Sequence, residues 1–143
     1  MKIKPLPLYR SLSLAMAFTF AAVGLILVFL PVRVLEFFNR LSPALGLSPA
    51  PDHPGSFFPI LAASYMVLVT ALAWRMFKKP ANPSMPQLLL LGKLASAILS
   101  LVYFFGRSPH LVCLANAIAD GGIAVLVLWL YFLQRKHAAA WPT

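Results

Sequence analysis

Four long apolar runs constrain the fold of this chain more than any other feature of its sequence. They cover residues 12–30, 57–74, 88–105 and 111–133, and the only charged residues within them are Lys93 and Asp120. A helix needs about 20 mostly apolar residues to cross a bilayer. The sequence therefore predicts an all-α membrane protein, an antiparallel bundle of four transmembrane helices. We expect residues 1–143 to form a single membrane domain.

The composition agrees with a chain whose main solvent is lipid. Hydrophobic residues make up 61% of the 143 residues and charged residues 10%, whereas a soluble domain carries about 25% charged residues. The net charge of +9 would suit a nucleic-acid partner if the basic residues lined one face. They stand instead at the ends of the apolar runs, where basic residues meet lipid headgroups. We expect the lipid bilayer as a partner and no nucleic acid.

The basic residues also predict how the chain is oriented. One side of the membrane would carry Lys2, Lys4, Arg10, Arg75, Lys78, Lys79, Arg135 and Lys136. The other side would carry Arg33, Arg40 and Arg107. Because the more basic side faces the cytosol, both termini are predicted to be cytosolic. The first run is longer than the apolar part of a signal peptide, about 7–15 residues, so we interpret it as a retained span.

Residues 31–56 form the longest predicted loop, on the outer side. Apolar residues recur at helical intervals over 32–41, and Pro31 suits the first position of a helix. We predict a short amphipathic helix here, lying at the membrane interface. Residues 42–54 contain four prolines, and we expect an ordered turn or cap there.

Lys93 and Asp120 are the most informative residues chemically, since ionisable groups inside a membrane are costly unless paired or hydrated. The third and fourth spans are joined by a short turn, so they should be antiparallel neighbours. Counting 1.5 Å per residue from that turn places Lys93 and Asp120 within about 5 Å of the same depth. We therefore expect the two side chains to meet. The pattern leaves open whether the pair is static packing or a functional site.

Other polar residues share the helix faces of this pair. Ser96 and Ser100 follow Lys93 on one face, and Asn116 precedes Asp120 by one turn. The short second loop brings Thr70 to a similar depth. We call these six residues, Lys93, Ser96, Ser100, Asn116, Asp120 and Thr70, the polar seam. Small residues that would let the helices approach closely are Gly92, Ala97, Ala117, Gly121 and Gly122.

Several kinds of chemistry lack the residues they need. We find no metal-ligand spacing, no nucleophile with a base and no phosphate-binding loop. Cys113 is the only cysteine, which excludes a dithiol redox pair within the chain. His53, His110 and His137 lie outside the apolar runs. We predict no catalytic residue, no metal and no cofactor, and the pattern favours a protein that is not an enzyme without settling the question.

The layout resembles that of the small four-helix DoxX-like bacterial inner-membrane proteins. The resemblance is carried by Arg10, a first span that contains Gly24, Pro31 at its end and three further spans. It implies a location in the bacterial inner membrane and a role as a small membrane subunit, for some members beside quinone-linked redox enzymes. The proline-rich outer loop and the Lys93–Asp120 pair depart from the family pattern, so no site residue carries over.

Three functions are compatible with these features. The first is an accessory or structural subunit of a larger, redox-linked or other membrane complex, held to other membrane subunits or to further copies of itself. The second is a binder or carrier of a small lipophilic ligand, such as a quinone or a lipid, at the polar seam. The third is a proton-coupled transporter that uses Asp120. The sequence favours the first. The discriminating observation is whether the Lys93–Asp120 region faces a cavity, another subunit or solid packing.

Overall fold

The structure, a computed structural model, describes residues 5–51, 58–107 and 109–141. Helices account for nearly all of this part of the chain. They are α1 (Pro5–Phe29), α2 (Pro31–Leu41), α3 (Phe58–Lys78), α4 (Ser84–Gly106) and α5 (Leu111–His137), with the 3-10 turns η1 (Pro43–Leu45) and η2 (Ala138–Ala140). The long helices α1, α3, α4 and α5 are each long and apolar enough to cross a membrane. The prediction of four apolar helices is confirmed.

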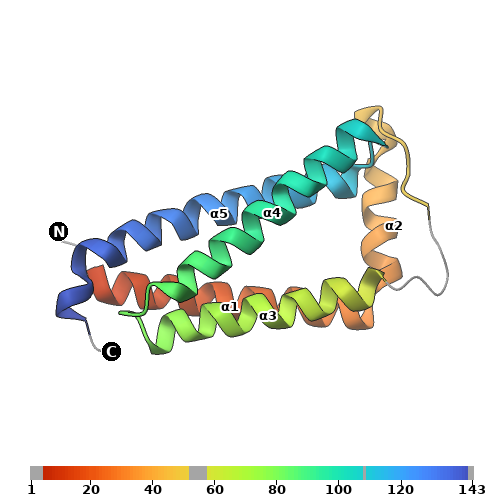
Figure 1. The fold of residues 1–143 in the computed structure, drawn as a ribbon. Helices are drawn as coiled ribbons and strands as arrows, with labels where there is room; N and C mark the ends of the chain where they lie inside the picture. The colour runs from red at the N-terminus through yellow and green to blue at the C-terminus, as the bar shows by residue number, and fades with distance from the viewer. Residues whose placement is uncertain (1–4, 52–57, 108, 142–143) are drawn as a thin grey trace.

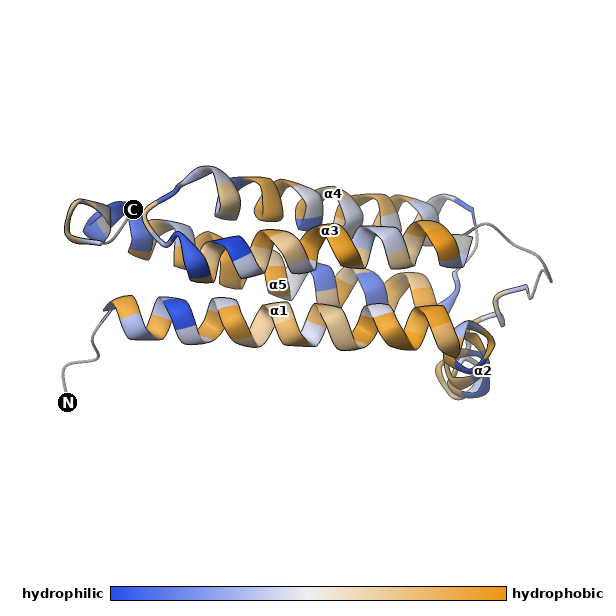
Figure 2. Cartoon of the chain, turned by 90° about the horizontal axis from the view of Figure 1, so that it is seen from below, coloured by the Kyte–Doolittle hydropathy of each residue, from blue (hydrophilic) through white to orange (hydrophobic). Residues whose placement is uncertain are grey.

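The long helices are arranged as two pairs. Helix α1 packs along α3 and helix α4 packs along α5, and these two contacts are far more extensive than that between α3 and α4. The start of α1 and the end of α5 lie at one end of the molecule, here called the terminal end, and α2 crosses the opposite end, here called the α2 end (Figure 1). Hydrophobic segments predominate along the long helices, whereas α2 carries both kinds (Figure 2).

The sharp bend between α1 and α2 follows from one dipeptide. Proline disfavours the helical conformation of the residue before it and has no N–H to donate. Leu30 accordingly has φ −133° and ψ 41°, outside the helical region, and Pro31 occupies the first turn of α2. A single non-helical residue therefore separates the two helices, which is why α2 turns away from the direction of α1 (Figure 1).

The observed helices extend beyond the predicted spans mainly at the terminal end. Helix α1 begins at Pro5 instead of residue 12, α3 continues to Lys78 and α5 to His137. The hydropathy pattern predicts where apolar residues stop, but charged residues such as Lys and Arg are good helix formers. A helix can therefore continue through basic residues where the apolar run stops.

The segment after α2 is fixed on that helix by one side chain. The Asn39 amide nitrogen donates to the Ala50 carbonyl at 2.9 Å, and the Ala50 backbone N–H donates to Asn39 Oδ1 at 2.8 Å. Ser42 donates to the Phe38 carbonyl at 2.9 Å. The ordered turn predicted for residues 42–54 is thus present through residue 51, and residues 52–54 lie outside the described part.

The apolar core occupies only the terminal half of the molecule. It consists of Tyr9, Met16, Ala17, Phe20, Val69, Ala73, Met76, Leu89, Val127, Leu130 and Trp141. Every helical member lies between the terminal end and the depth of Lys93 and Asp120. The half of the molecule nearer α2 has few fully buried apolar side chains, so the apolar core does not extend into it.

Two glycines allow close helix contact, and two others that we predicted for this role do not. A Cβ atom at position 24 would lie 3.0 Å from Met66 Cβ, and one at position 92 would lie 3.3 Å from the Tyr65 hydroxyl oxygen. At Gly121 and Gly122 it would meet no atom within 4 Å. Gly121 and Gly122 therefore make no close helix contact within the described chain, and their packing role stays a prediction. The small size of a residue permits close approach but does not determine which side of its helix is approached.

The α1–α3 contact should depend on the missing side chain of Gly24. We expect Gly24→Leu to lower the thermal unfolding midpoint in mild detergent, because overpacking of this kind costs about 1–3 kcal/mol. The matched control is Gly122→Leu, in an exposed position of α5. Equal midpoints for both variants would contradict the close α1–α3 contact.

Candidate functional site

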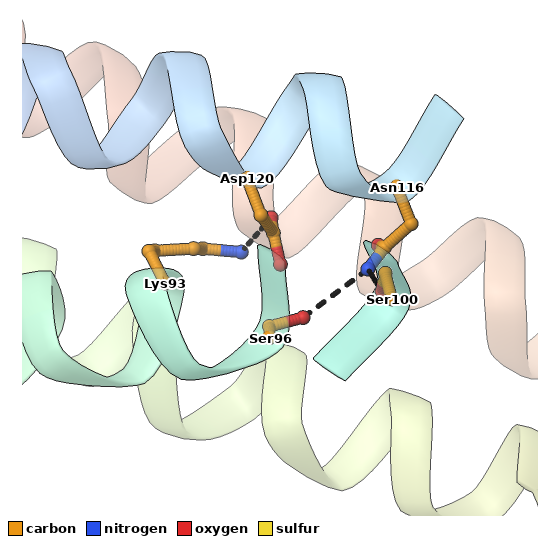
Figure 3. A network of polar contacts seen from close by, with 5 residues as sticks. All are labelled: Lys93, Ser96, Ser100, Asn116 and Asp120. Atoms are coloured by element: carbon orange, nitrogen blue, oxygen red, sulfur yellow. Dashed lines mark hydrogen bonds and ion pairs between the residues drawn. The ribbon is translucent and has the colours of Figure 1, made fainter. Parts of the chain in front are cut away.

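Lys93 and Asp120 form a buried ion pair between α4 and α5. The Lys93 ammonium donates to Asp120 Oδ1 at 2.7 Å, and the two side chains are only 1% and 5% exposed. Figure 3 shows them pointing toward each other from facing helices. The contact expected from their depths is thus present in the structure. Two opposite charges at this distance form a short, charge-assisted hydrogen bond.

Two aromatic rings complete the surroundings of the Lys93 ammonium. It lies 4.8 Å from the centre of the Phe20 ring of α1 and 4.9 Å from the centre of the Tyr65 ring of α3. Both distances suit a cation–π interaction, whose strength increases where water is excluded. One lysine on α4 therefore contacts α1, α3 and α5, which connects the α1–α3 pair to the α4–α5 pair.

A second polar contact follows one helical turn nearer the α2 end. The Asn116 amide nitrogen of α5 donates to Ser100 Oγ at 2.8 Å and to Ser96 Oγ at 3.2 Å, both on α4 (Figure 3). The carboxamide thus bridges both serines that share the helix face of Lys93. The ion pair and the Asn116 contacts together form a polar strip between the two helices, with the charges at one end and neutral groups at the other.

The structure brings together five of the six residues of the polar seam. Thr70 is the exception, since its hydroxyl donates to the Met66 carbonyl of its own helix at 2.6 Å. A hydroxyl satisfied by the carbonyl four residues earlier has no proton left for a neighbouring helix. The contribution expected from α3 comes instead from Tyr65. Of the predicted packing residues, Ala97 and Ala117 are buried and Gly92 meets Tyr65.

The strip borders a lateral groove. The groove has a volume of about 670 Å³ and is lined by Tyr65 of α3, by residues of α4 and by Cys113 of α5. The residues of α4 are Gly92, Ala95, Ser96, Leu99, Ser100 and Tyr103. It is open to the side of the molecule, and a smaller hollow that shares Leu99 and Tyr103 continues it to Arg107. Solid packing thus stops at the ion pair, and open space begins beyond it.

Sequence reasoning missed Phe20 and Tyr65 as parts of this site. Both are ordinary apolar-run residues in a chain with eleven phenylalanines and four tyrosines. A buried lysine predicts that some group will stabilise its charge, but it does not say which aromatic residue will do so. The close spacing of Tyr65 and Gly92 across α3 and α4 is a three-dimensional feature without a signal in the sequence.

The histidines and Cys113 form no metal centre in the described residues, where no group of three or more His, Cys, Asp or Glu side chains comes together. His110 Nδ1 lies 3.0 Å from the Ser48 carbonyl oxygen, which joins the segment after α2 to the start of α5. The ring of His137 stacks on that of Trp141 with centroids 6.3 Å apart. His53 lies outside the described residues.

Comparisons with protein families, curated proteins and solved structures find no match for this chain. The resemblance in layout to DoxX-like proteins therefore stays a prediction. The candidate site rests on its own geometry.

Breaking the ion pair should destabilise the protein more than removing it. Asp120→Asn leaves the Lys93 ammonium buried beside a neutral amide, and loss of one partner of a buried pair costs about 3–5 kcal/mol. We expect the double variant Lys93→Met, Asp120→Leu to recover much of this loss, because it leaves no unpaired charge.

Thermal unfolding of the single and double variants in mild detergent measures this coupling. The control is Glu36→Gln, which removes the exposed Arg33–Glu36 contact of 3.9 Å on α2 and should leave the midpoint unchanged. An Asp120→Asn midpoint equal to that of the wild type would show that the pair does not hold the helices together.

Proposed function

We propose that this protein is an integral membrane protein whose four spans form an antiparallel bundle and bind a small lipophilic molecule in the groove beside the ion pair. The observation that carries this proposal is the groove itself. It combines walls made largely of apolar side chains with a few polar groups, Tyr65, Ser96 and Ser100, which is the usual composition of a ligand site. A solid, dry interior at this depth would have argued for purely structural packing.

The membrane part of the proposal is supported by the helices and by charge. The four long helices match the length and hydropathy of spans, and α2 lies across them as an interfacial helix would (Figures 1 and 2). The basic residues at the ends of α3 and α5, with Arg10 near the start of α1, support a cytosolic terminal end. The groove then opens in the outer half of the membrane. The bacterial inner membrane is the setting that the DoxX-like layout implies.

The two other functions stay predictions. An accessory subunit of a larger complex needs a partner surface, and the exposed apolar side chains of α4, such as Leu91 and Ile98, would meet lipid equally well. A proton-coupled transporter needs a relay to Asp120. The contacts of Asp120 favour a fixed pair with Lys93, so the groove is the stronger indication of function.

A bulky side chain in the groove tests the proposal. Ala95 lines the groove and is exposed, so Ala95→Phe places a phenyl ring in it without entering the core. We expect the wild-type protein, extracted in mild detergent, to retain a lipophilic species enriched over the bulk membrane lipids, and the Ala95→Phe variant to lose it. Mass spectrometry of solvent extracts measures the retained species.

The matched control is Leu94→Phe, on the same helix but outside the groove. It should retain the species at the wild-type level. An identical lipid profile for the wild type and both variants would remove the support for a ligand in the groove.

A further inference from the structure

The two serines of the groove have hydroxyl protons without an acceptor in the described chain. Both accept a hydrogen bond from Asn116, which uses a lone pair of each hydroxyl and leaves each proton free. Thr70 and Ser42 behave differently, since each donates to the carbonyl four residues earlier. Ser96 and Ser100 therefore face the groove as hydrogen-bond donors.

Tyr65 adds a third donor from the opposite wall. Its hydroxyl oxygen is buried and has no hydrogen-bond partner among the described residues, although it lines the groove together with the two serines. Buried hydroxyl groups almost always have a partner in folded proteins. The hydroxyls of Tyr9 and Ser13 also lack one, but these residues do not line the groove. The absence of Cβ at Gly92 lets the Tyr65 hydroxyl approach α4, where a ligand between the helices would meet all three donors.

The inner end of the groove carries no net charge. Its lining residues are all uncharged, and the neighbouring Lys93 ammonium is already neutralised by Asp120 at 2.7 Å. An anionic headgroup would lose its hydration here without gaining a free counter-charge, which is strongly unfavourable. The second oxygen of Asp120 also lacks a partner. That oxygen can take one hydroxyl proton, and two hydroxyls then still lack an acceptor.

We propose that the groove recognises an uncharged lipophile whose polar end is a carbonyl-type hydrogen-bond acceptor, held by the hydroxyl of Tyr65 and by one of the hydroxyls of Ser96 and Ser100. This inference rests on the proposed function and names its ligand class. A carbonyl oxygen accepts two hydrogen bonds and bears no charge, which matches donors that lack acceptors in a neutral site. The apolar remainder of the ligand lies along Leu99 and Ala95 toward the open side of the groove.

Three compounds with the same chain test the headgroup: 2-tetradecanone, tetradecane and tetradecyl phosphate. The full-length protein is placed in nanodiscs of zwitterionic lipid, and binding is the amount of each compound retained beyond that in empty nanodiscs, measured by mass spectrometry. We expect the ketone to bind about 25-fold more tightly than the other two, since two neutral hydrogen bonds, each a factor of about 5, correspond to about that ratio.

Hydroxyl deletions then locate the polar end of the ligand. Tyr65→Phe and the double variant Ser96→Ala, Ser100→Ala should each weaken ketone binding about 5-fold and leave tetradecane binding unchanged. Tyr131→Phe is the matched control, because its hydroxyl accepts from Gln87 outside the groove. It should bind the ketone as the wild type does.

The alternative outcomes separate this inference from the proposed function. Tightest binding of tetradecyl phosphate, lost in Arg107→Gln, would overturn the inference in favour of an anionic headgroup at the outer end of the groove. Equal binding of all three compounds that Ala95→Phe abolishes would leave the proposed function standing and overturn the ligand class. Retention no greater than in empty nanodiscs for every compound would overturn both.

Discussion

The ion pair between Lys93 and Asp120 determines how the rest of this molecule is organised. Moving two charges out of water is costly, and their mutual attraction offsets that cost only with good geometry and further contacts. Here the contact is 2.7 Å long, and the rings of Phe20 and Tyr65 stabilise the ammonium from two other helices. Because the contact between α3 and α4 is much smaller than the contacts within each pair, the contacts of this lysine help to join the two helix pairs.

The pair also marks the boundary between two kinds of interior. Toward the terminal end, apolar residues such as Met76 and Leu130 are fully buried in the core. Toward the α2 end, small and hydroxyl-bearing residues replace them, and the groove opens. This division places the proposed binding groove in the half of the molecule that lies outside the apolar core.

The sequence predicts the contacts between α4 and α5 better than the contacts between the α1–α3 pair and the α4–α5 pair. The short connection between α4 and α5 fixes relative depth, so Lys93 meets Asp120 and Asn116 meets Ser100 at the expected level. Depth alone does not predict the hydrogen-bond partner of Thr70, because a hydroxyl in a helix has the carbonyl four residues earlier as a nearer acceptor. No short connection links α1 to α4, and the involvement of Phe20 therefore had no basis in spacing. The predicted spans are shorter than the helices because basic residues end an apolar run without ending the helix.

The Lys93–Asp120 pair also determines which kinds of chemical group face the groove. A lysine and an aspartate that neutralise each other contribute structure but no net charge to the neighbouring space. What faces that space is a set of hydroxyl groups, two of them held by Asn116 and one, on Tyr65, without a partner in the described chain. Charged ligands would compete against an already satisfied pair, whereas a neutral acceptor would complete hydrogen bonds that the protein leaves open. If the groove binds a ligand as proposed, the buried charges act on its selectivity indirectly, because they leave the site without net charge and hold Tyr65 close to α4.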